Sequence, residues 1–169
     1  MIEYPYHHQS GKLPSSLASV QFLTTVSNDC LDDVLKHTTI IECSPGDVII
    51  EEGQDGGKYF FILVKGLVQI VKSDEEIGRI GNPGELIGEQ ALLKGASGDS
   101  GSTERTATVK ALEHTFCIKV NPSYLDELSD GDRQAYYAVL YRFIATLLAD
   151  RLSQANQRIA ELEKRLSVS

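Results

Sequence analysis

Between residues 38 and 120, short apolar segments alternate with turn-forming segments at close intervals. The apolar segments are rich in β-branched and aromatic residues, and they are TIIEC, DVIIEE, KYFFILV, LVQIVK, EIGRI, ATVKAL and TFCIKV. Segments rich in Gly, Pro, Asp and Ser separate them, among them SPGD, GQDGG and GNPG. Seven or more short strands at this spacing predict a small barrel or sandwich.

Helical patterns flank this β-rich centre. Before it, SSLASVQFLTTV and NDCLDDVLKH have the spacing of amphipathic helices, and after it NPSYLDEL predicts a brief helix. Residues 133–166 contain neither Gly nor Pro and predict a long helix. We therefore expect an α+β fold that is mainly β, with an arm over residues 1–14, one domain over residues 15–130 and a long helix over residues 131–169.

The long helix carries apolar residues at alternating steps of four and three, the pattern of a coiled-coil seam. The seam consists of Tyr141, Ala145, Leu148, Leu152, Ala155, Ile159, Leu162 and Leu166. A neighbouring face with Leu140, Ile144 and Leu147 could pack on the barrel. Pairing with the same helix of a second subunit would bury the seam, so we expect a homodimer. The alternative is a surface helix that lies on its own domain.

Composition narrows the function classes. The chain has 169 residues, 41% hydrophobic and 24% charged, and a net charge of −8, which argues against an electrostatic surface for nucleic acid or an anionic membrane. The N-terminus lacks the features of a signal peptide, and no stretch is apolar enough to span a membrane, so we expect a cytoplasmic protein. Cys30, Cys43 and Cys117 are odd in number and lie in apolar contexts, which predicts reduced core thiols and no metal site.

Two charged residues mark a candidate binding site. Gly88 precedes EQALL, whose one helical turn would expose backbone amides to an anion, with Glu89 in that turn. Arg105 opens the alternating run RTATVKAL, and its planar guanidinium suits phosphate oxygens. A carboxylate beside an anion site suits a sugar hydroxyl, so the pair suggests a sugar phosphate. An ordinary salt bridge between Arg105 and Glu89 is the alternative.

Four motifs occur in order along the chain, namely SPGDVIIEEGQ, FFILVKGLVQI, IGNPGELIGEQALLKG and RTATVKA. Together they resemble the cyclic nucleotide-binding domain of the catabolite activator protein and of the regulatory subunits of cyclic-nucleotide-dependent kinases. The resemblance covers roughly residues 15–150. It implies a β-roll, a double-stranded β-helix of the jelly-roll type, that holds one cyclic nucleotide. The link from Gly95 to Arg105 is longer than in the family, and Glu104 stands where a Pro is common. The loop ASGDSGST within this link is either a lid or a tolerated insertion.

The resemblance also implies roles for single residues. Gly88 and Glu89 match the Gly-Glu of the phosphate-binding cassette, in which the Glu accepts the ribose 2′-hydroxyl. Arg105 would bind the exocyclic phosphate oxygens. The backbone amides that would complete the phosphate site belong to Gln90, Ala91, Leu92 and Ala107. Thr106 raises cGMP as the ligand beside cAMP, because a Thr at this position contacts guanine or the phosphate in kinases and channels that prefer cGMP.

We therefore expect a regulatory receptor that is not an enzyme, needs no cofactor and passes occupancy to the dimerising helix and to a downstream effector protein. Candidate base-capping residues on the helix are Tyr137, Tyr141, Arg142 and Thr146. The chain shows no DNA-reading helix-turn-helix, which disfavours direct nucleic acid binding. One alternative is a degenerate domain that binds no nucleotide and serves as a dimerisation module. A remote one is a serine hydrolase, because GDSG occurs in the loop; however, Ser100 lies in a Gly/Ser stretch and no triad motif accompanies it.

Overall fold

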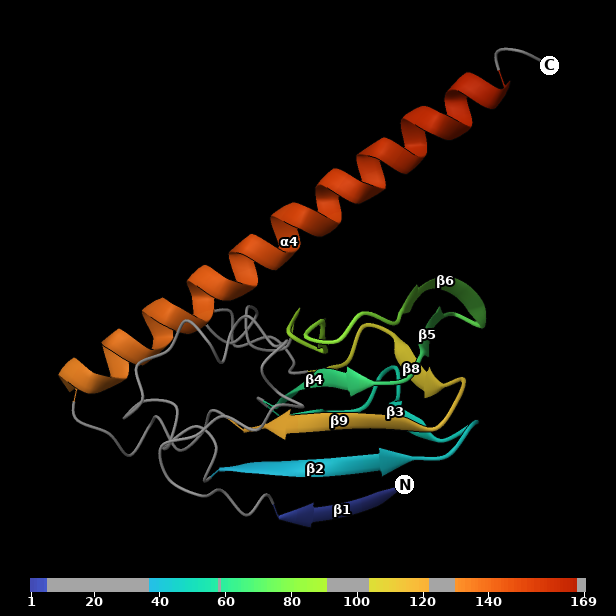
Figure 1. Cartoon of the computed structure of the whole chain (residues 1–169). Helices are drawn as coiled ribbons and strands as arrows, with labels where there is room; N and C mark the ends of the chain where they lie inside the picture. Colours follow the sequence, from blue (N-terminus) through green and yellow to red (C-terminus); the bar gives the residue numbers. More distant parts are fainter. Residues whose placement is uncertain (6–36, 58, 91–103, 122–129, 167–169) are drawn as a thin grey trace.

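Two antiparallel sheets form the body of the molecule (Figure 1). The computed structural model describes residues 1–5, 37–57, 59–90, 104–121 and 130–166, without the side chains of residues 132, 135, 139, 143, 147 and 150. One sheet has the strand order β1 (Ile2–Pro5), β2 (Thr38–Cys43), β9 (Thr115–Val120), β4 (Phe60–Lys65) and β7 (Leu86–Ile87). The other has the order β3 (Val48–Ile50), β8 (Thr108–Ala111), β5 (Val68–Lys72) and β6 (Glu75–Ile80). All seven predicted strands are present, and the mainly β prediction is confirmed.

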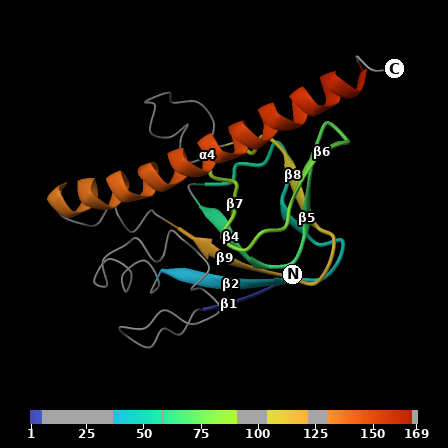
Figure 2. The same cartoon turned by 45° about the horizontal axis from the view of Figure 1, so that its top comes forward.

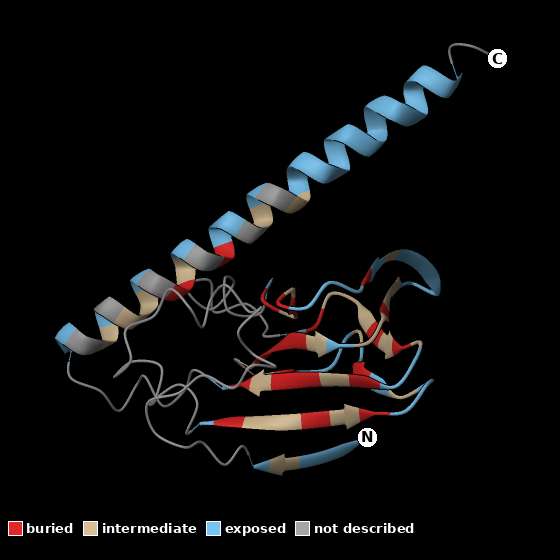
Figure 3. Ribbon diagram, in the orientation of Figure 1, coloured by how far each residue is buried: buried red, intermediate tan, exposed pale blue. Residues whose placement is uncertain are grey.

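Many apolar residues of the strands are buried, and buried residues are coloured red in Figure 3. Ile41, Phe61, Val68 and Val109 are among those that form one hydrophobic cluster. β4 is buried along most of its length, with Phe60, Phe61, Ile62 and Leu63 each at most 2% exposed. Such side chains contribute roughly 1.5–3 kcal/mol each when fully buried. The connections are tight because Gly46, Gly66 and Gly84 turn the chain with positive φ angles of 90°, 113° and 92°.

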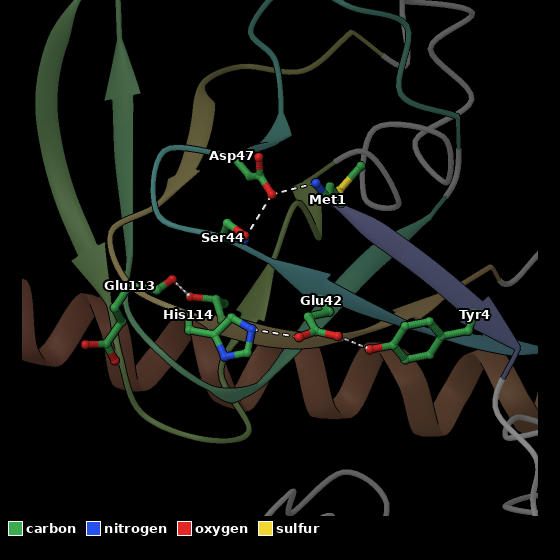
Figure 4. Close-up of polar contacts among 8 residues, drawn as sticks. Met1, Tyr4, Glu42, Ser44, Asp47, Glu113 and His114 are labelled. Carbon is green, nitrogen blue, oxygen red and sulfur yellow. Dashed lines mark hydrogen bonds and ion pairs between the residues drawn. The ribbon is translucent and has the colours of Figure 1, made fainter.

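The N-terminus differs from the expected irregular arm. Residues 2–5 form β1, which pairs antiparallel with β2 from Ile2 opposite Glu42 to Pro5 opposite Thr39. The Met1 ammonium contacts the Asp47 carboxylate at 2.6 Å (Figure 4). Sequence patterns do not predict this strand, because it has only four residues, ends in Pro and lies at the edge of the sheet.

The long helix is present as α4 (Asp130–Leu166), 37 residues long. At 1.5 Å per residue it measures about 55 Å. Figures 1 and 2 show it passing the sheets obliquely, with its C-terminal part projecting beyond them. Leu140 and Ile144 are buried, as expected for the face that packs on the domain, whereas residues 152–166 are all exposed.

Several predicted features lie outside the described residues. These are the two helices predicted over residues 15–37, of which only His37 is described, the brief helix predicted after Asn121, most of the loop before Arg105, and Cys30, Ala91, Leu92, Ser100 and the side chain of Leu147. Among the described helices, none is long and apolar enough to cross a bilayer.

Candidate functional site

Strand pairing brings Gly88, Glu89 and Arg105 to one place. β7 pairs with β4, with Ile87 opposite Phe61, and this pairing fixes the chain at the residue before Gly88. Arg105 lies three residues before β8, and its backbone is bound by the loop that follows β3. The Gly53 N–H donates to the Arg105 carbonyl and the Arg105 N–H donates to the Gln54 carbonyl, each at 2.9 Å. The two charged segments are thus fixed by separate strands.

The Arg105 side chain is buried and is held by neutral groups. Only 5% of the residue is exposed. Its Nη1 donates to the Gly88 carbonyl at 2.8 Å, and its Nη2 donates to the carbonyls of Gly56 at 2.9 Å and Tyr59 at 2.7 Å. Its buried Nε has no acceptor among the described residues, and no described carboxylate forms an ion pair with it. The positive charge is therefore not neutralised within the described part of the chain.

Two glycines make room for this guanidinium. A Cβ atom on Gly56 would lie 1.8 Å from the Arg105 Nε, far inside contact distance. A Cβ on Gly88 would lie 2.6 Å from Ile50 Cδ1 and 2.7 Å from Arg105 Nη1, and the φ angle of Gly88 is +79°. Both positions therefore require glycine as long as Arg105 keeps its place.

Glu89 is equally buried, at 4% exposure, but its ionic partner comes from the long helix. The Arg151 Nη1 contacts the Glu89 Oε1 at 2.9 Å, and the Arg151 Nη2 donates to the Leu86 carbonyl. The alternative of a salt bridge between Arg105 and Glu89 is therefore not what the structure shows. Glu89 instead connects the binding site to α4.

These residues line a cavity of about 290 Å³, close to the lower size of small-molecule sites, ~300 Å³. Its apolar lining residues include Ile50, Ile70, Ile80, Leu86, Ile87 and Val109. Its polar and charged lining residues are Lys72, Glu89, Gln90, Glu104, Arg105, Thr106 and Arg151, and the Thr106 hydroxyl donates to the Gln90 Oε1 at 3.0 Å. Such a mixed lining suits a ligand with an apolar part and an anionic part.

Six of the eight predicted ligand-binding residues line the cavity, and the other two, Ala91 and Leu92, lie outside the described residues. Gly88, Glu89, Gln90, Arg105, Thr106 and Ala107 all line it. The four capping candidates do not appear among the described residues that line it. Tyr137 stacks on Tyr141 with a centroid distance of 5.6 Å, and the exposed Thr146 donates to the carbonyl of the exposed Arg142. The described part of α4 reaches the cavity through Arg151 instead.

Three residues of the site were missed by sequence reasoning, namely Gly56, Tyr59 and Arg151. Gly56 and Tyr59 act through backbone carbonyls, which leave no signature in side-chain patterns. Only the GG pair in GQDGG hints at a close backbone approach. Arg151 lies beside the predicted seam, and its contact depends on how α4 crosses the domain.

The two described cysteines are buried thiols. Cys43 and Cys117 are buried and free, and burial raises the pKa of Cys43 to about 11 and of Cys117 to about 12. Both thiols are therefore protonated at neutral pH. No group of three or more His, Cys, Asp or Glu side chains converges as a metal site within the described ranges.

The sequence of this chain is similar to known cyclic nucleotide-binding domains. The sequence profile of the cyclic nucleotide-binding domain family matches residues 40–132, more than half of the chain. Cyclic GMP-dependent protein kinase 2 of Mus musculus is 34% identical over 161 residues, which make up 90% of this chain and 20% of that protein. The type II regulatory subunit of cAMP-dependent protein kinase of Drosophila melanogaster is 29% identical over 103 residues, 61% of this chain and 25% of that protein. The chain thus spans a quarter or less of the length of these relatives.

The fold agrees as well. A cyclic nucleotide-binding domain from Methylobacillus flagellatus superimposes with a TM-score of 0.65 at 20% identity, covering 83% of this chain and 80% of that chain. The profile match begins at Ile40 within β2, extends beyond β9 and includes the segments that carry Glu89 and Arg105. The chain belongs to the cyclic nucleotide-binding domain family.

Proposed function

We propose that this chain is a regulatory receptor that binds a cyclic nucleotide without turnover. The observation that carries the proposal is the buried Arg105, which has no carboxylate partner among the described residues and shares a cavity with Glu89. A buried charge is costly unless a counter-charge reaches it. A phosphate supplies that charge, and a sugar hydroxyl beside it gives Glu89 a donor. A sugar phosphate satisfies both groups at once.

The cavity suggests how such a ligand would lie. The guanidinium of Arg105 would bind the exocyclic phosphate oxygens, helped by the backbone amides of Gln90, Ala91, Leu92 and Ala107. Glu89 would accept the ribose 2′-hydroxyl with the oxygen that Arg151 does not use. The base would then lie against apolar lining residues from β5, β6 and β8, namely Ile70, Ile80 and Val109.

The choice of base turns on Thr106. Thr106 lines the cavity, and its hydroxyl donates a hydrogen bond to Gln90, which also lines it. A hydroxyl there can also donate to or accept from an edge of guanine or a phosphate oxygen. Together with the cGMP-dependent kinases among the relatives, Thr106 favours cGMP over cAMP as the ligand.

Occupancy would be passed on through α4. Arg151 holds Glu89 from the last part of the helix that touches the domain, and the exposed seam begins at the next residue, Leu152. A ligand can shift the position of α4 only by binding the two positions with different affinity. We propose that two copies pair through the seam and that a separate effector protein reads the paired helices. The cytoplasm is the compartment expected for such a receptor.

Isothermal titration calorimetry with cGMP and cAMP tests the binding function. We expect one site per chain, and loss of measurable binding in Arg105→Ala. Arg79→Ala is the matched control, because Arg79 is exposed, pairs with Glu76 at 2.8 Å and does not line the cavity. Ligand at ~100 times its Kd should stabilise the wild type by about 2.7 kcal/mol in thermal melts. If neither nucleotide gives heat or a melting shift, the chain is a dimerisation module that binds no nucleotide.

A further inference from the structure

Tyr59 contacts Arg105 in two ways. Its carbonyl accepts a hydrogen bond from Nη2 at 2.7 Å, and its ring lies under the guanidinium, with Cζ 4.6 Å from the ring centroid. The ring is itself fixed, because it packs edge-on against Phe61 at 5.5 Å, and Phe61 is a core residue that is 2% exposed. A single residue immediately before β4 thus connects the guanidinium to the hydrophobic core.

The chemistry of this support leaves the charge available. An aromatic face attracts a cation through its quadrupole, and a carbonyl attracts it through its dipole, but neither carries a net charge. Lys119 provides the contrast within the same cluster. Its Nζ lies 4.7 Å from the same ring centroid, yet it also pairs with the Glu3 carboxylate at 3.1 Å. Lys119 is therefore neutralised by an acid, whereas Arg105 is held in place by neutral groups.

We propose that Tyr59 is a positioning residue, whose ring orients the Arg105 guanidinium toward the cavity and keeps its charge for an anionic ligand. This proposal rests on the proposed function, in which Arg105 binds the phosphate diester of a cyclic nucleotide. A carboxylate in place of the ring would hold the guanidinium equally firmly but would cancel the charge that attracts the phosphate. The aromatic ring holds the guanidinium in place without cancelling its charge.

Calorimetric titration of three variants with cGMP and cAMP tests the role of the ring. Tyr59→Leu removes the ring but keeps the backbone carbonyl, and we expect affinity to fall about five- to thirty-fold, the contribution of a desolvated cation–π pair. Tyr59→Phe keeps the aromatic face and should bind within about twofold of wild type, since the two rings attract cations similarly. Tyr4→Leu makes the same kind of change in β1, away from the cavity, and should leave affinity unchanged.

A second measurement does not depend on ligand or on the stability of Tyr59→Leu. Guanidinium protons above an aromatic face are shifted upfield, so the side-chain N–H signals of Arg105, assigned by their loss in Arg105→Lys, should lie upfield in ligand-free wild type and in Tyr59→Phe. Normal shifts for these signals, or Tyr59→Leu binding as tightly as wild type, would overturn the role of Tyr59 alone. A wild type with upfield signals that binds neither nucleotide would instead remove the proposed function and, with it, the ligand for which Arg105 is positioned.

Discussion

At the scale of the residue, the position of Arg105 depends on Gly56, because a glycine has no side chain. The guanidinium lies so close to this backbone that a Cβ would overlap its Nε. The carbonyl of the same glycine accepts a hydrogen bond from Nη2, so the loop both makes room for the cation and binds it. A small residue is therefore as important here as the charged one.

Gly56→Ala should displace Arg105 and lower cyclic nucleotide affinity by about tenfold or more, equivalent to the ~1.5–3 kcal/mol of a hydrogen bond to a charged group. Gly78→Ala is the matched control, since a Cβ on Gly78 in β6 meets nothing within 4 Å. Neither glycine has a φ angle in the left-handed region, so backbone strain is the same for both. Titration calorimetry on the two variants gives the comparison, and equal affinities would show that Arg105 does not need the space above Gly56.

At the scale of the element, β1 is an edge strand held by ionisable groups (Figure 4). Glu42 on β2 accepts hydrogen bonds from the Tyr4 hydroxyl and from His114, and these bonds hold the pKa of Glu42 below its ordinary value. The Met1 ammonium lowers the pKa of Asp47, and Asp47 in turn raises the pKa of the Met1 amino group. The attachment of β1 therefore depends on pH at both ends of the range.

Protection of the β1 amides from hydrogen exchange should be greatest near neutral pH. The lowered carboxyl pKa values mean that the contributions of Glu42 and Asp47 are present above their ordinary pKa values and are lost as the pH falls through the lowered ones. The raised pKa of the Met1 amino group means that its contribution is lost as the pH rises through that value. Glu42→Gln should reduce the change in protection at acid pH and leave the change at alkaline pH as it is in the wild type. Protection factors corrected for intrinsic rates test this, and a flat profile would contradict it.

Arg151 connects α4 to the cavity. Its removal leaves the buried Glu89 carboxylate without its ionic partner, and such unpaired buried groups cost about 1–3 kcal/mol. Arg151→Gln should therefore lower stability by roughly that amount, weaken nucleotide binding and speed exchange of the α4 amides near Ile144. Arg158→Gln, on the exposed part of the same helix, is the control. Urea unfolding and exchange mass spectrometry measure both effects, and identical behaviour of the two variants would rule out a link through Arg151.

The sequence predicted the elements of the fold better than their contacts. Seven strands and the long helix follow from local patterns of apolar, β-branched and turn-forming residues. β7 was missed because two residues are too few to form a pattern. Glu89 and Arg105 could be singled out because each lies in a recognisable sequence motif. The ionic partner of Glu89 could not be predicted, because Arg151 reaches it only through the tertiary placement of α4. Contacts between backbone carbonyls and a side chain leave still less trace in a sequence.

At the scale of the whole molecule, the helix has two parts with different surroundings. Up to Arg151 one face of α4 is covered, since Leu140 and Ile144 are buried and Arg151 pairs with Glu89. Beyond it, Leu152, Ile159, Leu162 and Leu166 are 62%, 53%, 51% and 78% exposed. These four residues belong to the predicted seam, and an apolar stripe of this spacing on a free helix is the surface that a coiled coil buries.

Removing residues 152–169 should convert a dimer to a monomer without loss of the binding site, because a cut after Arg151 preserves its contact with Glu89. Light scattering coupled to size exclusion gives the mass of each form, and calorimetry shows whether the short chain still binds nucleotide. Ile159→Asp should also yield a monomer, since it places a charge in the seam, whereas Ala160→Asp places the same charge beside the seam and should remain a dimer. A full chain that is monomeric at high concentration would show that the seam does not pair with itself. A dimer that persists in the short chain would instead place the interface within residues 1–151. The effect of ligand binding would then have to reach the second subunit without the exposed part of α4.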